Sequence, residues 1–326
     1  MGKEAGHERR RDTILMSALK TTTAEALHAG YVQRAGDWRR DHLGASIIGH
    51  QCDRYLWLSF RWAFAPGHDG KLLRLFERGQ REEAWIIDDM RAIGCEVVDR
   101  DPVTGDQFRL RDGHVAGSID GIVSKLREAD GEHLLEVKTS NAKQFVKMKL
   151  ERVKRAKPDH YAQMQTYMHF MDLPAAYYVA VCKDTDEIYT EIVKADSSYA
   201  TKIIDRAKAI TLRPDAPERM DKDFAPCILV SKDGTRWPCQ FYELCHSSSP
   251  VLAEKNCRTC LDSVPSSDGK WHCKLHDKNL SPHDQRVGCN QQLVQPDLLN
   301  MSTVEVGNRS ITYQAQNGQQ VTDGRK

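Results

Sequence analysis

Hydrophobic positions follow two different periods along this chain, and the periods predict where helices and strands lie. Apolar residues recur at helical spacing, and turn residues bound short apolar runs that are typical of strands. The predicted helices cover 42–64 (after a compact turn), 70–94, 141–157, 159–173 and 197–212. The predicted strands cover 95–99, 106–111, 114–123 and 133–139, with two more within 175–193. This order of elements indicates an α/β core with a mixed central β-sheet flanked by helices.

The pattern changes after residue 212. A proline-rich polar stretch comes first, then closely spaced cysteines, and finally a tail that alternates around Asn317-Gly318, which is a β-hairpin signal. The chain therefore divides into four predicted parts. They are a basic N-terminal segment (1–37), the core (38–250), a small Cys-rich lobe (251–298) and a polar tail with the hairpin (299–326).

Composition adds little to this picture. The chain has 326 residues, 40% of them hydrophobic, and a net charge of +1, so only local charge clusters can indicate a partner. Neither an apolar leader nor a run of about 18 apolar residues occurs, so no membrane association and a cytoplasmic location are expected. In that compartment the ten cysteines are expected to be thiols or metal ligands rather than disulfides.

The stretch "GSIDGIVSKLREADGEHLLEVKTS" carries the first candidate chemistry. Glu136 and Lys138 point to one side of a predicted strand, whereas Leu135 and Val137 point to the other. Asp120 lies in the turn-like segment before it. Two carboxylates with the Val137 carbonyl oxygen suit Mg²⁺ or Mn²⁺, and Lys138 would orient a water or stabilise developing charge. The plain alternative is a salt bridge on the strand surface.

Two helices carry further candidates. Glu83 lies upstream of the strands and would complete an acidic cluster, with Glu82 as the alternative and a solvated helix face as the plain reading. Gln163 and Tyr167 are four residues apart and share one helix face, where an amide and a phenol can hold a phosphate.

Basic residues crowd the segment after the strand. Residues 138–157 contain eight Lys or Arg and a single acid, Glu151, and such a stripe would follow a nucleic-acid backbone unless it is only a solvated helix face. The DNA-binding candidates are Lys143, Lys147, Lys154, Arg155 and Lys157.

Together these residues resemble the PD-(D/E)XK nuclease superfamily, and more narrowly its phage exonucleases of the lambda-exonuclease/YqaJ and RecB-like groups. The motif residues are Glu83, Ile119-Asp120, Glu136-Val137-Lys138, Gln163 and Tyr167. The resemblance implies a restriction-endonuclease-like core and Mg²⁺-dependent phosphodiester hydrolysis. "RRDHLGASIIG" also resembles the segment that holds a 5′-phosphate, with Arg39 or Arg40 and Ser46 in that role, although Ser46 could instead cap a helix.

The resemblance further implies a DNA exonuclease acting on linear duplex ends in recombination or repair. The alternatives are an endonuclease or junction nuclease, or a non-catalytic DNA-binding protein on the same scaffold. A single-strand annealing protein and further copies of the chain are the implied partners. The bacterial host cytoplasm is the implied location.

The cysteines form two groups. Cys257, Cys260, Cys273 and Cys289 include one C-x2-C knuckle, which suits a structural Zn²⁺ site in a lobe with little core of its own. Buried free thiols are the alternative. The spare zinc ligands are His272, His276 and His283.

The second group has one cysteine before the core and three after it. RecB-like nucleases clasp an iron–sulfur cluster in this way, so the resemblance implies the same role for Cys52, Cys227, Cys239 and Cys245. The usual C-x2-C is absent, because position 236 is Arg236 and Cys227 lies eleven intervening residues before Cys239. A second zinc site, or plain core packing of Cys52, remains the alternative.

Overall fold

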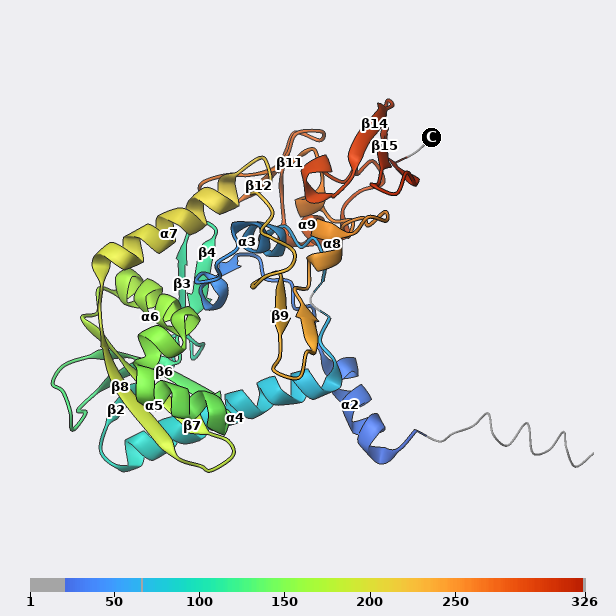
Figure 1. The fold of residues 1–326 in the computed structure, drawn as a ribbon. Helices are drawn as coiled ribbons and strands as arrows, with labels where there is room; N and C mark the ends of the chain where they lie inside the picture. Colours follow the sequence, from blue (N-terminus) through green and yellow to red (C-terminus); the bar gives the residue numbers. More distant parts are fainter. Residues whose placement is uncertain (1–20, 66, 325–326) are drawn as a thin grey trace, which may run out of the picture. The chain divides into compact units, whose positions relative to one another are not determined.

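In the computed structural model the described residues are 21–65 and 67–324, and they form two compact units (Figure 1). The first unit contains residues 21–38 and 67–81, and the second contains 39–65 and 82–324. Residues 1–20 of the predicted basic segment lie outside the described residues. Helix α4 (Gly70–Ala92) begins in the first unit and ends in the second. Every candidate site residue belongs to the second unit.

The first unit contains helix α2 (Thr23–Arg34), which begins with a capping box. The Thr22 hydroxyl accepts a hydrogen bond from the Glu25 amide at 3.2 Å, and the Glu25 carboxylate accepts one from the Thr22 amide at 2.8 Å. These bonds satisfy amides at the helix start that have no partner within the helix.

The central sheet of the second unit has five strands in the order β2-β5-β6-β7-β8. Strands β6 and β7 are parallel and the other neighbours are antiparallel, so the predicted mixed sheet is confirmed. The strands are β2 (Glu96–Val98), β5 (Gly121–Ser124), β6 (His133–Ser140), β7 (Ala175–Cys182) and β8 (Ile188–Lys194).

Helices pack on both faces of this sheet. Ile87 of α4 belongs to the same buried cluster as Val137, whereas Met164 belongs to the cluster of Leu134. Side chains alternate along a strand, so Glu136 and Lys138 lie on the Leu134 side. The remaining core helices are α3 (Asp53–Phe60), α5 (Ala142–Ala156), α6 (Pro158–Met171) and α7 (Ser197–Leu212).

These helices confirm the periodicity, with one interruption. Arg152 has a φ of 63°, outside the helical region, so α5 is kinked near its end. Pro158 then starts α6 at a position where proline costs no helix hydrogen bond.

A second, three-stranded sheet has the order β1-β4-β3. Its strands are β1 (Leu43–Gly44), β3 (Arg109–Asp112) and β4 (Val115–Ser118), and the short helix η1 (Ala45–Ile47) follows β1. The single central sheet predicted from the pattern was therefore incomplete. Strand β4 pairs with β1 and β3, and the chain, which leaves the five-stranded sheet after β2, returns to it at β5. Asp120 lies at this change of sheet.

The C-terminal region is built from short elements. Its strands are β9 (Ile228–Val230), β10 (Arg236–Pro238), β11 (Ser263–Pro265), β12 (Trp271–Cys273), β13 (Lys278–Leu280), β14 (Ser302–Val306), β15 (Ser310–Gln314) and β16 (Gln320–Gly324). Its helices are α8 (Tyr242–His246), η2 (Cys257–Thr259), α9 (Pro282–Val287) and η3 (Pro296–Leu298). The predicted hairpin is confirmed: β15 and β16 are antiparallel around Gly318, whose φ of 84° favours glycine.

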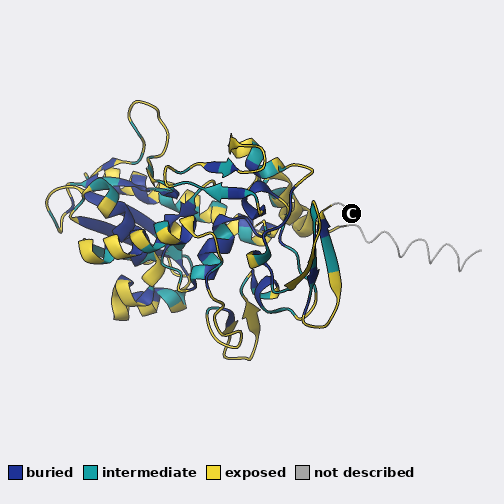
Figure 2. Cartoon of the chain, turned by 90° about the horizontal axis from the view of Figure 1, so that it is seen from above, coloured by how far each residue is buried: buried dark blue, intermediate teal, exposed yellow. Residues whose placement is uncertain are grey.

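Burial follows the sheet and the helices that cover it (Figure 2). Trp57 and Trp62 are buried, as their helical spacing with apolar neighbours predicts. Trp85 also has helical spacing with apolar neighbours, which would predict burial, but it is 63% exposed on α4. Among the described residues, no helix is both long and apolar enough to span a bilayer.

Candidate active site

Asp120 is fixed to strand β6 by its backbone. The residue is only 9% exposed, and Oδ2 accepts a hydrogen bond from the Val137 amide at 2.8 Å. This bond ties the change of sheet at Asp120 to the E-x-K strand. Two segments that are 17 residues apart in sequence therefore meet at one point.

Glu136 and Lys138 meet on the same face of β6, as the strand period requires. Glu136 is fully buried and pairs with the Lys138 ammonium, which also lies 3.9 Å from Asp120 Oδ2 and donates to the Val137 carbonyl at 3.3 Å. The Oε2 atom of Glu136 has no hydrogen-bond partner among the described residues. A buried carboxylate oxygen without a partner is costly, and a cation would compensate it.

Glu83 joins this group from α4. Burial first, and then the Asp120 carboxylate, raise its pKa to about 7, against the partial relief that Lys138 provides. The pKa of Glu136 is also raised, chiefly by burial, which outweighs the opposing effect of Lys138. Glu83 therefore lies close enough to Asp120 for their charges to interact. We call Glu83, Asp120, Glu136 and Lys138 the acidic cluster.

Gln163 and Tyr167 lie on α6 beside this cluster. Both are buried, they are hydrogen-bonded to each other, and the pKa of Tyr167 is raised by burial and then by Glu136. Gly117 makes room for the phenol, because a Cβ atom at that position would overlap the Tyr167 hydroxyl. The i,i+4 spacing therefore places the two side chains as the sequence predicts.

The sequence reasoning missed two neighbours of the cluster, His160 and Tyr178. The His160 ring nitrogen lies 2.9 Å from the Tyr178 hydroxyl, and Tyr178 pairs with Glu136 in the β6/β7 register. Burial, followed by the charges of Lys138 and Lys157, lowers the pKa of His160 to about 3, so the imidazole is neutral at physiological pH. The only sequence signal was His160 preceding Gln163 on the same helix.

A cavity of about 580 Å³ lies on the other side of Gln163 and Tyr167, which both line it. Its wall carries Arg39, Arg40 and Ser46, the residues that the resemblance assigned to a 5′-phosphate. The structure thus brings these candidates together, and Arg40 donates a hydrogen bond to the Ser46 hydroxyl at 2.9 Å. The walls also contain arginines that the sequence gave no reason to choose, namely Arg109, Arg111 and Arg286.

The basic stripe on α5 is partly neutralised by acidic residues that precede, occupy and follow β8. Lys149 lies 3.4 Å from Glu187, Arg152 lies 3.0 Å from Glu191, and Lys154 lies 3.7 Å from Asp196. The sequence count could not include these acids, because each follows its basic partner by more than 35 residues. Lys147 pairs with Glu151 at 3.8 Å. Within the described chain, the remaining candidates, Lys143, Arg155 and Lys157, form no ion pair.

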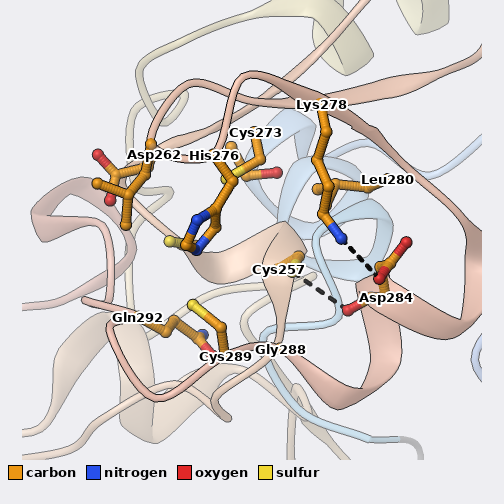
Figure 3. A pocket seen from close by; sticks show the side chains of 13 residues that line it. Cys257, Asp262, Cys273, His276, Lys278, Leu280, Asp284, Gly288, Cys289 and Gln292 are labelled. Carbon is orange, nitrogen blue, oxygen red and sulfur yellow. Dashed lines mark hydrogen bonds and ion pairs between the residues drawn. The ribbon is translucent and has the colours of Figure 1, made fainter.

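The cysteines of the C-terminal lobe line one cavity of about 290 Å³ (Figure 3). We call Cys257, Cys260, Cys273 and Cys289 the lobe thiols. His276 lines the same cavity, whereas His272 and His283 do not. Burial and then the three neighbouring cysteines raise the pKa of Cys257 to about 12. These thiols are therefore close enough for their charges to interact.

Cys52, Cys227, Cys239 and Cys245, which we call the core thiols, line a smaller cavity of about 20 Å³. The hairpin of β9 and β10 explains how the distant Cys227 takes part. It folds the intervening residues away, so that the Cys239 amide donates to the Cys227 carbonyl at 2.8 Å. Two arginines, Arg54 and Arg219, border the same cavity and would offset thiolate charge.

Neither the lobe thiols, nor the core thiols, nor the acidic cluster are arranged as a preformed metal site. Among the described residues, no group of three or more His, Cys, Asp and Glu side chains is placed to hold a metal ion. The metal-binding character predicted for the C-terminal lobe is therefore not shown. In the acidic cluster the Lys138 ammonium pairs with Glu136 and lies 3.9 Å from Asp120 Oδ2.

The site and a family comparison together define the class of protein. Residues 65–174, which contain the acidic cluster together with Gln163 and Tyr167, match the profile of the YqaJ-like viral recombinase domain. This is a domain of the PD-(D/E)XK type, and the match covers about a third of the chain. Over residues 65–174 the predicted resemblance to the YqaJ group is therefore confirmed.

Several solved structures are similar to this chain. An alkaline exonuclease, LHK-Exo from Laribacter hongkongensis, is 16% identical, with 57% of this chain and 90% of that chain covered and a TM-score of 0.39. A phage related exonuclease from Haemophilus somnus 129PT is 16% identical, with 52% and 91% covered and a TM-score of 0.37. No curated protein matches the chain significantly.

Proposed function

We propose that this protein is a Mg²⁺- or Mn²⁺-dependent exonuclease that degrades linear duplex DNA from its ends in phage-type recombination or repair. The observation that carries the proposal is the fully buried Glu136, whose Oε2 has no partner in the described part of the chain, beside Asp120 and Lys138. Burying a carboxylate oxygen without a partner is costly, and a metal ion bound there would supply the missing partner.

The metal ligands would be the carboxylates of Asp120 and Glu136 and the carbonyl oxygen of Val137. Hard oxygen ligands suit Mg²⁺ and Mn²⁺. Burial is the main cause of the raised pKa values of Glu83 and Glu136, and a bound cation would oppose it by favouring the charged carboxylates. When bound, such an ion neutralises phosphate charge and lowers the pKa of a water.

The chain's own groups supply the rest of the chemistry. Lys138, which lies beside both Asp120 and Glu136, would orient the attacking water or stabilise charge on the phosphate. Gln163 and Tyr167 hold the strand to be cut, since their amide and phenol line the cavity next to the cluster. Glu83 adds a third carboxylate near the cation. His160 stays neutral and supports Tyr178.

The DNA end would enter the cavity lined by Arg39, Arg40 and Ser46, which would hold its 5′-phosphate. Arginine forks suit phosphate oxygens, and the Arg40–Ser46 hydrogen bond already orients the guanidinium. Along α5, Lys143, Arg155 and Lys157 would contact the DNA backbone directly. Lys147 and Lys154 would first have to break their ion pairs with Glu151 and Asp196. A single-strand annealing protein and further copies of this chain are the proposed partners, in the cytoplasm of the host.

The cysteine groups are proposed metal sites of two kinds. The lobe thiols would hold a structural zinc ion, since four sulfurs around one cavity match its tetrahedral preference. The core thiols would hold an iron–sulfur cluster or a second zinc ion. A cavity of about 20 Å³ has room for roughly one water molecule, so a cluster would require these thiols to move apart.

A nuclease assay with Mg²⁺ on linear and covalently closed circular duplexes tests the proposal. Each 5′ and 3′ end is labelled separately, and the wild type is compared with Asp120→Asn. We expect loss of linear DNA only, early release of one label, and no activity in the variant. Cleavage of circles would instead identify an endonuclease. Full activity of Asp120→Asn would contradict the proposed site.

A further inference from the structure

The C-terminal lobe reaches the substrate cavity through one side chain. Arg286, on α9, lines the cavity together with Gln163 and Tyr167, although more than 110 residues of sequence separate it from either. It is the lobe's contribution to a wall that otherwise comes from residues 39–46, the β3–β4 region and α6. The lobe therefore does more than enclose its own thiols.

Arg286 is held in place by contacts to the core. Its guanidinium group lies 5.3 Å from the Trp62 ring, and Nη2 donates to the Arg39 carbonyl at 3.4 Å. Nη1 donates to the Pro282 carbonyl at 3.0 Å, within its own helix. A cation stacked near an aromatic ring keeps its charge while its conformational freedom is reduced.

The Cys257–Cys260 segment also holds helix α9 in place. Arg258, which lies between Cys257 and Cys260, is 1% exposed, and its Nη2 donates to the Asp41 carbonyl at 2.9 Å. Its Nε donates to the Gln285 side chain at 2.8 Å, one residue before Arg286. The chain of contacts from the lobe thiols to the cavity is thus continuous.

The cavity has a strong excess of positive charge. Five arginines line it (Arg39, Arg40, Arg109, Arg111 and Arg286), against a single acid, Asp41. Asp41 is already paired with Arg111 at 2.8 Å, and Arg39 is paired with Glu254 at 2.8 Å. With respect to the described residues, Arg40 and Arg109 form no ion pair. Such an excess around an open cavity fits a polyanion.

We propose that Arg286 is a DNA-binding residue and that the Cys-rich lobe thereby forms part of the DNA-binding surface. Its ligand is a backbone phosphate of the strand whose end occupies the cavity. The proposal rests on the proposed nuclease function and extends it to a lobe outside the matched recombinase domain. Arg258 is the positioning residue that connects the lobe thiols to Arg286.

Binding of a fluorescent duplex with Ca²⁺ in place of Mg²⁺ tests the inference, with the dissociation constant measured over a range of salt concentrations. We expect Arg286→Ala to weaken binding about tenfold and to reduce the slope of log K against log salt by about 0.9, the value for one phosphate contact. Arg286→Lys keeps the charge, so it should retain the slope and recover part of the affinity. Lys270→Ala removes an equal charge from an exposed site in the lobe that does not line the cavity, and should change neither quantity.

The outcomes separate the two proposals. If the wild type binds and cleaves DNA but Arg286→Ala has an unchanged slope and affinity, the inference about the lobe is wrong and the nuclease proposal stands. If Arg286→Ala and Lys270→Ala weaken binding equally, the effect is general charge loss and the inference is again wrong. A wild type that neither binds nor cleaves DNA would remove both proposals.

Discussion

The Asp120 carboxylate accepts a hydrogen bond from the Val137 amide at 2.8 Å, and this contact joins the two sheets of the core at its candidate metal ligands. The bond gives Asp120 a structural role in addition to its proposed role as a ligand. A substitution of Asp120 that keeps an oxygen acceptor for the Val137 amide should therefore be more stable than one that removes it.

Asp120→Asn retains an oxygen that can accept from Val137, whereas Asp120→Ala leaves a buried amide without a partner. We expect both variants to lose nuclease activity, because neither supplies a charged ligand. Only Asp120→Ala should lose about 1–3 kcal/mol of unfolding free energy. Activity assays and urea unfolding check this together, and equal stability of the two variants would contradict the structural role.

Lys138→Ala should abolish cleavage while leaving DNA affinity nearly unchanged, because arginines and lysines elsewhere provide the phosphate contacts. The loss of the lysine also leaves Glu136 without its only ion-pair partner among the described residues. Mg²⁺ should therefore stabilise the variant at least as much as it stabilises the wild type. Cleavage rates, binding and melting temperatures with Mg²⁺ measure this. Lys270→Ala, an exposed lysine that lines neither the acidic cluster nor the arginine-lined cavity, is the control.

The metal-free protein should become less stable as pH rises through the acidic cluster's titration. The pKa of Glu83 is raised from 4.5 to about 7, so between these values the folded state binds more protons than the unfolded state. Stability then falls with rising pH across that window. Glu83→Gln should flatten this part of the melting temperature profile, and Glu82→Gln should not.

The same titration should govern metal binding. Mg²⁺ requires deprotonated carboxylates, so its apparent affinity and the cleavage rate should both increase from pH 6 to pH 8. Titration calorimetry at these two pH values, with Asp120→Asn as the control, is the measurement. An affinity that does not change with pH would show that these acids do not hold the ion.

Gly117→Ala should reduce cleavage without touching any charged group. The added methyl group would overlap the Tyr167 hydroxyl and displace the phenol from the cavity wall. We expect a loss of activity similar to that of Tyr167→Phe, and little further loss when the two are combined, since both act on one side chain. Additive losses in the double variant would contradict this relationship.

Purified protein should carry about one zinc ion on the lobe thiols, measurable by elemental analysis after gentle purification. Cys260→Ser should lose this zinc and lower the melting temperature, because a structural zinc ion stabilises a small lobe. Its DNA affinity should also fall, since Arg258 connects the knuckle to Arg286. Metal-free protein with normal affinity would argue against zinc. Absorbance near 400 nm would instead indicate an iron–sulfur cluster on the core thiols.

The sequence by itself determined the features that depend on local period and spacing. The strand period placed Glu136 and Lys138 on one face, the helical period placed Gln163 beside Tyr167, and Asn317-Gly318 produced the hairpin. These relationships hold within a single element. The backbone geometry of a strand, helix or turn fixes them regardless of what packs against it.

Only the tertiary structure decided which distant segments meet. It placed Glu83 rather than Glu82 in the field of Asp120, and it exposed Trp85. It also paired α5 lysines with acids near β8 and folded the β9–β10 hairpin, so that Cys227 reaches Cys239. Arg286 entered the substrate cavity in the same way. Such contacts depend on the packing of whole elements against one another, which no local pattern of polar and apolar residues encodes.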